Sequence, residues 1–298
     1  MTKQAVITDE ISQDIEQAVA VCREFDVSGI EIRSVWEKGP HELSDNEIHQ
    51  IRKLADKNNL RVPCIASPVY KSDFGNDAED AEHLDILDRC LWVAKQLNAE
   101  IVRVFTFWRK ESTPANWEAI ADKFQKPIAA ATKAGIILGV ENEPTTNATN
   151  GRETSNFVRN INHPNLRVVW DPGNDVFDPE REVPYPDGYE SVRDLICHVH
   201  LKDGNWDDTQ QQFQAVPLGE GEVDYLAQLN SLLLKDNYQG WLSLETHYRP
   251  KIQLNDEIVQ RPKGSQFSAD GEAGTRECLA NLNAMLRIVN CTHPGETD

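Results

Sequence analysis

The sequence lacks the features that mark several large protein classes. No uninterrupted apolar run in its 298 residues approaches the ~20 residues of a membrane helix, which excludes a transmembrane protein. No apolar segment precedes Asp9 and Glu10, so we expect no signal peptide and a cytoplasmic location. The six cysteines include no Cys-x-x-Cys pair, so we expect reduced thiols, with neither a zinc finger nor thioredoxin chemistry.

Basic residues are scarce. Thirty Lys and Arg stand against 49 Asp and Glu, which gives a formal net charge of −19. A surface with this balance repels phosphate backbones and anionic lipids, so we expect no nucleic-acid partner and no membrane partner. Apolar residues make up 39% of the chain, enough for a large core, which excludes a disordered protein.

Short apolar, β-branched runs recur eight times, and each is typical of a strand buried on both faces. Amphipathic helical stretches lie between them, such as Asp45–Asn58, where Ser44 is a favourable N-cap, and Pro114–Ala134. The predicted strands are Ala5–Ile11, Gly29–Val35, Val62–Tyr70, Ile101–Trp108, Ile137–Pro144, Leu166–Asn174, Ile196–Asp203 and Gly240–Tyr248.

Eight strand–helix units of this length predict an α/β protein with a single (β/α)8 TIM barrel. We expect one domain over residues 1–298, with its core at about 5–290. An open doubly wound sheet is the alternative, but no Gly-x-Gly-x-x-Gly follows the first predicted strand. Two long loops, 203–224 and 249–271, are expected to be lids, contacts to a partner subunit or disordered segments. The proline-rich segment 179–186 is expected to be irregular.

Ionisable residues follow four consecutive strands at the end where barrel enzymes place their active sites. The fifth strand ends in Glu141, the sixth in Asp171, the seventh in a His-x-His segment and the eighth in Glu245. Singly, such a Glu is more often a salt-bridge partner and such a His a packed core residue. Three carboxylates buried together, however, are very costly unless a cation neutralises them. The pattern therefore predicts one divalent metal ion, with Mn²⁺ preferred and Mg²⁺, Co²⁺ or Zn²⁺ as alternatives.

The chain resembles the xylose isomerase-like TIM barrel superfamily of sugar isomerases and epimerases, near the ketose 3-epimerases and the inosose dehydratases. The resemblance covers roughly residues 5–290. Five motifs carry it: Val140-Glu141-Asn142, Trp170-Asp171-Pro172-Gly173-Asn174, His198-Val199-His200-Leu201-Lys202-Asp203, Pro217-Leu218-Gly219-Glu220-Gly221-Glu222-Val223-Asp224 and Leu242-Ser243-Leu244-Glu245-Thr246-His247.

The resemblance implies that Glu141, Asp171, His200 and Glu245 bind one metal ion. It also implies that Glu141 and Glu245 lie on opposite faces of a sugar, so that one removes the proton next to a carbonyl and the other returns it. A metal-stabilised enediolate is the shared intermediate of isomerisation and epimerisation. Lys202 shares the inward parity of His200 and is a third catalytic candidate, as an acid or electrophile, although it can equally be an ion-pairing lysine.

Further polar and aromatic residues lie at or near strand ends, and each is as readily a packing or salt-bridge residue as a substrate contact. Glu220 and Glu222 would repel an anion, which favours an unphosphorylated sugar or cyclitol, whereas Arg249, Lys251, Arg261 and Lys263 leave a phosphorylated one open. The substrate-binding candidates are Glu10, Arg33, Tyr70, Trp108, Asn174, His198 and His247.

Three alternatives accompany this hypothesis. A dehydratase or lyase acting on a keto-inositol or keto-sugar would use the same metal site, with Lys202 or His247 protonating the leaving group. A non-catalytic sugar-binding barrel or complex subunit would need no metal. The DNA-repair endonuclease branch of the superfamily is rejected, because the third and fourth strands end without histidine and Asn174 stands where that branch has a ligand. By resemblance, a homodimer or tetramer is also expected.

Overall fold

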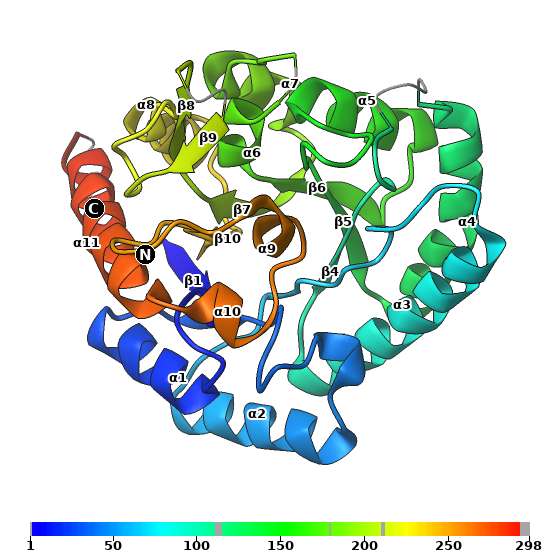
Figure 1. The fold of residues 1–298 in the computed structure, drawn as a ribbon, viewed down its shortest axis with the longest axis horizontal. Coiled ribbons are helices and arrows are strands. Elements are labelled where there is room, and N and C mark those ends of the chain that lie inside the picture. Colours follow the sequence, from blue (N-terminus) through cyan, green and yellow to red (C-terminus); the bar gives the residue numbers. More distant parts are fainter. Residues whose placement is uncertain (1, 111–114, 179, 210–211, 293–298) are drawn as a thin grey trace, which may run out of the picture.

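A computed structural model describes residues 2–110, 115–178, 180–209 and 212–292. Eight parallel strands form a nearly closed barrel, and helices surround it (Figure 1). The strands pair in the order β2-β1-β10-β7-β6-β5-β4-β3, and isolated bridges of Gly29 with Arg61 and Ile32 with Ile65 link the two ends of this row. The predicted (β/α)8 TIM barrel is confirmed.

Each of the eight predicted runs contains or overlaps one barrel strand. The runs extend too far at their carboxyl ends, because the loops there are buried at the barrel mouth and remain apolar. Glu10 lies in a 3₁₀ turn, η1 (Thr8–Glu10), and Asn174 lies in a short helix, α6 (Pro172–Val176), rather than in strands. The barrel strands are β1 (Lys3–Ile7), β2 (Gly29–Glu31), β3 (Cys64–Ile65), β4 (Ile101–Val104), β5 (Ile137–Glu141), β6 (Leu166–Trp170), β7 (Ile196–Leu201) and β10 (Trp241–Leu244).

The covering helices begin where side chains satisfy their first N–H groups. At α2, the Ser44 hydroxyl accepts from the Glu47 N–H and the Glu47 carboxylate accepts from the Ser44 N–H, a reciprocal cap that confirms the predicted start. The Pro114 of the predicted fourth helix lies outside the described residues. The helices are α1 (Ile15–Glu24), α2 (Asp45–Lys57), α3 (Asp77–Leu97), α4 (Trp117–Ala134), α5 (Gly151–Ile161), α6, α7 (Tyr189–Val192), α8 (Tyr225–Asn230) and α11 (Gly271–Thr292), with short helical turns η2 (Pro40–Glu42), η3 (Pro184–Gly188) and η4 (Ser231–Lys235).

No helix in the described ranges is long and apolar enough to cross a membrane. Within η3, Tyr185 has extended dihedral angles (φ −140°, ψ 127°), so the part of segment 179–186 that is described is irregular, as predicted. Pro179 lies outside the described residues.

Both long loops contain secondary structure that the sequence pattern did not reveal. Loop 203–224 holds an antiparallel hairpin of β8 (Gly204–Asp207) and β9 (Gln212–Ala215). Loop 249–271 holds α9 (Asp256–Gln260) and α10 (Gly264–Ser268), and α9 projects over the centre of the strand ring (Figure 1). This segment contacts the loops after β2 and β3, because Lys263 pairs with Glu42 and the Lys71 ammonium donates to the Gln260 carbonyl at 3.0 Å.

The barrel interior changes from apolar to ionised along the strands. Side chains alternate in direction, so every second residue of a strand points inward. Near the strand starts the interior is filled by a small apolar group, and ionisable side chains follow it toward the carboxyl ends. The apolar group consists of Cys64, Ile101 and Val169, with Ile137 and Cys197 packed against them.

Candidate metal centre

The four ligand candidates from the fifth to eighth barrel strands meet at the carboxyl end of the barrel. Glu141 ends β5, Asp171 follows β6, His200 lies in β7 and Glu245 follows β10. All four are buried, and each offers one ligand atom within 4.8 Å of the others. Atoms this close can share one cation at metal–ligand distances of about 2.0–2.2 Å.

His200 lies between carboxylates on both sides of its ring. Its Nδ1 is 2.9 Å from Oε1 of Glu141 and 3.0 Å from Oε2 of Glu245, and its Nε2 is 3.1 Å from Oε1 of Glu31. Burial alone would lower the pKa of His200, but the charges of Glu31, Glu141 and Glu245 hold it well above its usual value. Nδ1 therefore faces the two carboxylates with which it could share a cation.

Glu31, which was not predicted as a site residue, contacts two histidines. Besides His200, it contacts Nε2 of His198 at 2.9 Å. His198, predicted to bind substrate, is fully buried beneath His200 and is not in the four-residue group. Glu31 shares the inward parity of Arg33 on the second predicted strand, and this spacing could have identified it.

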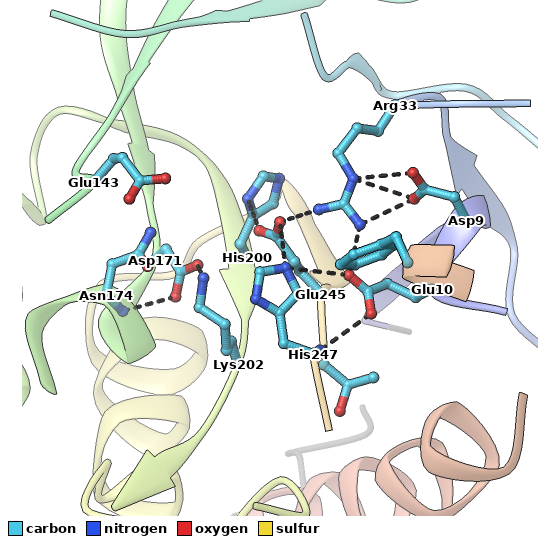
Figure 2. A network of polar contacts seen from close by, with 12 residues as sticks. Asp9, Glu10, Arg33, Glu143, Asp171, Asn174, His200, Lys202, Glu245 and His247 are labelled. Carbon is cyan, nitrogen blue, oxygen red and sulfur yellow. Dashed lines mark hydrogen bonds and ion pairs between the residues drawn. The ribbon is translucent and has the colours of Figure 1, made fainter. Parts of the chain in front are cut away.

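Asp171 is held in place by its own helix and by a buried lysine. It caps α6, with Oδ1 accepting from the Asn174 N–H at 3.3 Å, and its Oδ2 lies 2.8 Å from Nζ of Lys202 (Figure 2). Burial raises the pKa of Asp171 to about 6, against the opposing charge of Lys202. Burial would lower the pKa of Lys202, but Asp171 and Glu245 hold it above its usual value, so Lys202 is a fixed cation. Asn174, a predicted substrate contact, donates its amide to the Asn142 carbonyl at 2.8 Å.

Gly173 allows the ends of β6 and β7 to approach closely. A Cβ at this position would lie 2.4 Å from the Lys202 carbonyl oxygen, which is backbone and cannot move aside freely. Only glycine fits here, and the close contact brings Asp171 beside Lys202.

Two buried arginines pair with carboxylates of the four-residue group, Arg33 from the loop after β2 and Arg103 from β4, the strand next to β5. Arg33 pairs with Glu245, and Nη1 of Arg103 lies 3.1 Å from Oε2 of Glu141. Burial would raise the pKa of Glu245, yet Lys202, Arg33 and His200 hold it well below its usual value. Arg103 was not predicted, although a charged residue within the apolar run of β4 is a signal for an inward functional position.

Glu10 and His247 lie next to Glu245 and contact each other. Glu10 also forms ion pairs with two arginines. Glu10 accepts from Arg33 at 2.6 Å and from Arg249 at 3.2 Å (the Arg33 contact is drawn in Figure 2). Nε2 of His247 is 3.5 Å from Oε1 of Glu10 and 3.4 Å from Oε1 of Glu245. Burial lowers the pKa of His247, so its ring is neutral and able to accept a proton.

Of the two predicted aromatic contacts, one lies away from the site and one lies near it. The Tyr70 hydroxyl donates to the Lys123 carbonyl at 3.0 Å, and its ring stacks on Phe107 at 4.2 Å. Trp108 instead lies 5.8 Å from Nζ of Lys71, at the edge of the barrel mouth.

The donor set fits a divalent cation. Three buried carboxylates and one imidazole nitrogen form an oxygen-rich group, and Glu31 fixes the histidine ring from behind, as expected around a metal ligand. Two further groups of potential ligands in the described residues overlap with it, one centred on Glu31 and one made of Glu10, Glu245 and His247. In the first group, Glu31 positions His200. The second group places Glu10 and His247 beside Glu245.

A family model described as "Xylose isomerase-like TIM barrel" matches residues 19–277. The comparison with curated protein sequences gave no match. Three solved structures illustrate the similarity in fold, each with low sequence identity. They are a D-tagatose 3-epimerase-like protein (19% identity, TM-score 0.71, 98% of this chain and 99% of that one), an L-ribulose 3-epimerase (17%, 0.74, 98% and 97%) and the 3-keto-D-glucoside 4-epimerase of E. coli (17%, 0.67, 95% and 100%).

Proposed function

Because the chain belongs to the xylose isomerase-like TIM barrel family, we propose that it is a divalent-metal-dependent isomerase or epimerase of a sugar or sugar derivative. The observation that carries the proposal is the buried group of Glu141, Asp171, His200 and Glu245 at the carboxyl end of the barrel. The epimerase names of the similar structures support the same reaction class.

Glu141, Asp171, His200 and Glu245 would hold the cation, with Mn²⁺ preferred because three of the four donors are carboxylates. When bound, such an ion stabilises the negative charge that develops on adjacent carbonyl and hydroxyl oxygens of a sugar. Glu31 keeps the His200 ring in the orientation that turns Nδ1 toward the other ligands.

Glu141 and Glu245 are the proposed proton carriers, because both contact the same nitrogen of His200 from different strands. One carboxylate takes the proton from the carbon next to the carbonyl, and the electron pair of that C–H bond forms the enediolate double bond. The other carboxyl group returns a proton to the opposite face of the same carbon, which inverts it. Return to the neighbouring carbon instead interconverts an aldose and a ketose.

Lys202 contributes a fixed positive charge beside Asp171, since its raised pKa opposes proton donation.

His247 is better suited to move a proton, because it is neutral and 3.4 Å from Glu245. This position of His247 favours a second candidate function, a dehydratase or lyase in which the enediolate expels a β-substituent. His247 would first accept the abstracted proton from Glu245 and then pass it to the departing substituent. Cytoplasmic location and assembly into a homodimer or tetramer stay predictions.

Hydrogen exchange with solvent tests the proposal. The Mn²⁺-loaded protein is incubated in D₂O with ketohexoses, pentuloses and keto-inositols, and NMR and mass spectrometry follow each sugar. We expect deuterium at the carbon next to the carbonyl, with no exchange by Glu245→Gln and normal exchange by Glu220→Gln, which changes an exposed acid. Product that has lost water or a substituent identifies the lyase. A metal-loaded protein that exchanges no substrate contradicts the proposal and favours a non-catalytic sugar-binding barrel.

A further inference from the structure

A cavity of about 260 Å³ lies beside the metal centre, between the loops after β2 and β3, the side chain of Arg103 on β4, and residues 260–263. Its charged lining is entirely basic: no aspartate or glutamate of the described ranges lines it. The basic charge of this lining is opposite to that of the whole chain, in which acidic residues outnumber basic ones by 49 to 30. The lysines and arginines that line it are Arg33, Lys71, Arg103, Arg261 and Lys263.

We propose that this cavity binds an anionic group of the substrate, a carboxylate or a phosphate monoester, while the reacting carbons lie at the metal centre. The proposal rests on the proposed function and narrows its substrate class to acidic sugars or sugar phosphates. Guanidinium and ammonium groups bind such oxyanions through charge-assisted hydrogen bonds, and arginine can do so with two donors at once.

Two cations that line the cavity, the half-buried Lys71 and the buried Arg103, are held by carboxylates that do not line it. Nζ of Lys71 lies 2.7 Å from Oε2 of Glu143, and Nη1 of Arg103 lies 3.1 Å from Oε2 of Glu141. A guanidinium has five N–H donors, so one such pair leaves others free. The cations are therefore oriented in advance and lose little conformational entropy when an anion binds.

Two arginines that line the cavity have N–H donors that the described contacts within the protein do not use. Nε of Arg103 is buried without a hydrogen-bond partner, and the whole residue is only 4% exposed. A buried unpaired guanidinium N–H is costly, so the contacts within the protein leave part of the donor capacity of Arg103 unused. Arg261 makes no ion pair within the described part of the chain, and its guanidinium lies 5.4 Å from the Trp108 ring.

Arg33 and Arg103 connect the cavity to the metal centre. Both line the cavity, and they also pair with Glu245 and Glu141, which are two of the four ligand candidates. One small molecule can therefore place its anionic group in the cavity and its reacting carbons near both glutamates.

The two glutamates that favoured an unphosphorylated substrate, Glu220 and Glu222, lie outside this cavity. Oε1 of Glu222 accepts from the Trp206 N–H at 2.7 Å, and neither Glu220 nor Glu222 lines this cavity. Arg261 and Lys263, two of the basic residues in the loop 249–271 that are compatible with a phosphorylated substrate, line the cavity. Lys251 of the same loop does not.

Anion binding to the full chain tests the proposal without depending on catalysis. Inorganic phosphate and acetate are titrated calorimetrically into the chelator-treated protein and again into the Mn²⁺-loaded protein. We expect binding of at least one anion in both forms, weakened about tenfold or more by Arg261→Gln. Arg261 makes no buried ion pair, so its substitution leaves folding intact. The matched control, Lys251→Gln, removes an exposed charge of the same segment and should bind as the wild type does.

Sugar ligands then identify the anion. A neutral ketohexose, its phosphate monoester and the corresponding hexuronate are compared by dissociation constant and by deuterium exchange. Tighter binding of the phosphate or of the uronate, lost in Arg261→Gln while the neutral sugar is unaffected, supports the proposal and names the group. Anion binding that Arg261→Gln does not change, or equal binding of all three sugars, overturns it. Exchange with neutral sugars alone would leave the proposed function standing, whereas Arg261-dependent anion binding without any exchange would contradict only the proposed function.

Discussion

Glu31 and His200 face each other inside the barrel, with Oε1 of Glu31 3.1 Å from Nε2 of His200. This contact fixes the imidazole so that Nδ1 lies within 3.0 Å of both Glu141 and Glu245. Carboxylates that hold a metal-binding histidine in this way orient the ring and increase its basicity. Glu31 is therefore a positioning residue of the proposed centre.

Glu31→Gln should weaken Mn²⁺ binding by about 10–100-fold without abolishing it, because the four proposed ligands remain but the ring loses its anionic partner. Isothermal titration calorimetry measures the dissociation constant. Glu16→Gln, which changes an exposed glutamate of α1, serves as the control. An unchanged Mn²⁺ affinity in Glu31→Gln would show that His200 is not a ligand or does not depend on Glu31.

Lys202→Met should destabilise the chelator-treated protein by about 3 kcal/mol, because it breaks a buried ion pair with Asp171. Added Mn²⁺ should recover more stability in this variant than in the wild type, since the cation replaces the lost positive charge. Chemical denaturation with and without Mn²⁺ measures both effects. Lys123→Met removes a partly exposed partner of Asp80 and should cost no more than about 1 kcal/mol. A larger loss in Lys123→Met than in Lys202→Met would contradict this account of the site charges.

His83 makes the stability of the protein depend on pH. Its Nδ1 accepts from the Tyr70 N–H at 2.8 Å, and burial lowers the pKa of the ring below 6.5. The folded state then binds fewer protons than the unfolded state, so this contribution is complete above pH 6.5 and is lost as the pH falls through the lower folded pKa.

In His83→Asn, the amide oxygen can still accept the Tyr70 N–H but does not titrate. We therefore expect the free energy of unfolding of the wild type to fall relative to the variant as the pH is lowered from about 6.5 through the lower pKa of the folded state. Denaturant titrations at several pH values measure the difference. His49→Asn, at an exposed position of α2, provides the comparison. A difference between wild type and His83→Asn that is constant with pH would be incompatible with a neutral, buried His83.

The barrel and the four proposed ligands could be predicted because their signals are local. Each strand is a short apolar run, and each proposed ligand lies near the end of one or directly follows it. The parallel order therefore brings Glu141, Asp171 and Glu245 to the same end of the barrel. The strand ends themselves were predicted too far along the chain, since the loops of the barrel mouth are as apolar as strands. Glu10 and Asn174 were misplaced for this reason.

The contacts that tune the site could not be read from local pattern. Glu31 reaches His200 across the barrel interior, and Arg103 reaches Glu141 from the neighbouring strand. Both pairings depend on how the closed sheet aligns its strands. The basic cavity likewise combines Lys71 with Arg261, residues far apart in sequence, and depends on α9 and α10 forming in a loop without apolar periodicity. Tyr70 has the composition of a sugar contact, but tertiary packing on Phe107 directs it elsewhere.

Metal content of the purified protein tests the central claim most directly. Elemental analysis should find about one divalent ion per chain in the wild type and sharply less in both Glu245→Gln and His200→Ala, since each variant removes one of four ligands. A wild type that binds no ion, even when Mn²⁺ or Zn²⁺ is supplied, would contradict the metal-dependent function. An ion retained fully by both variants would show that the metal site lies elsewhere.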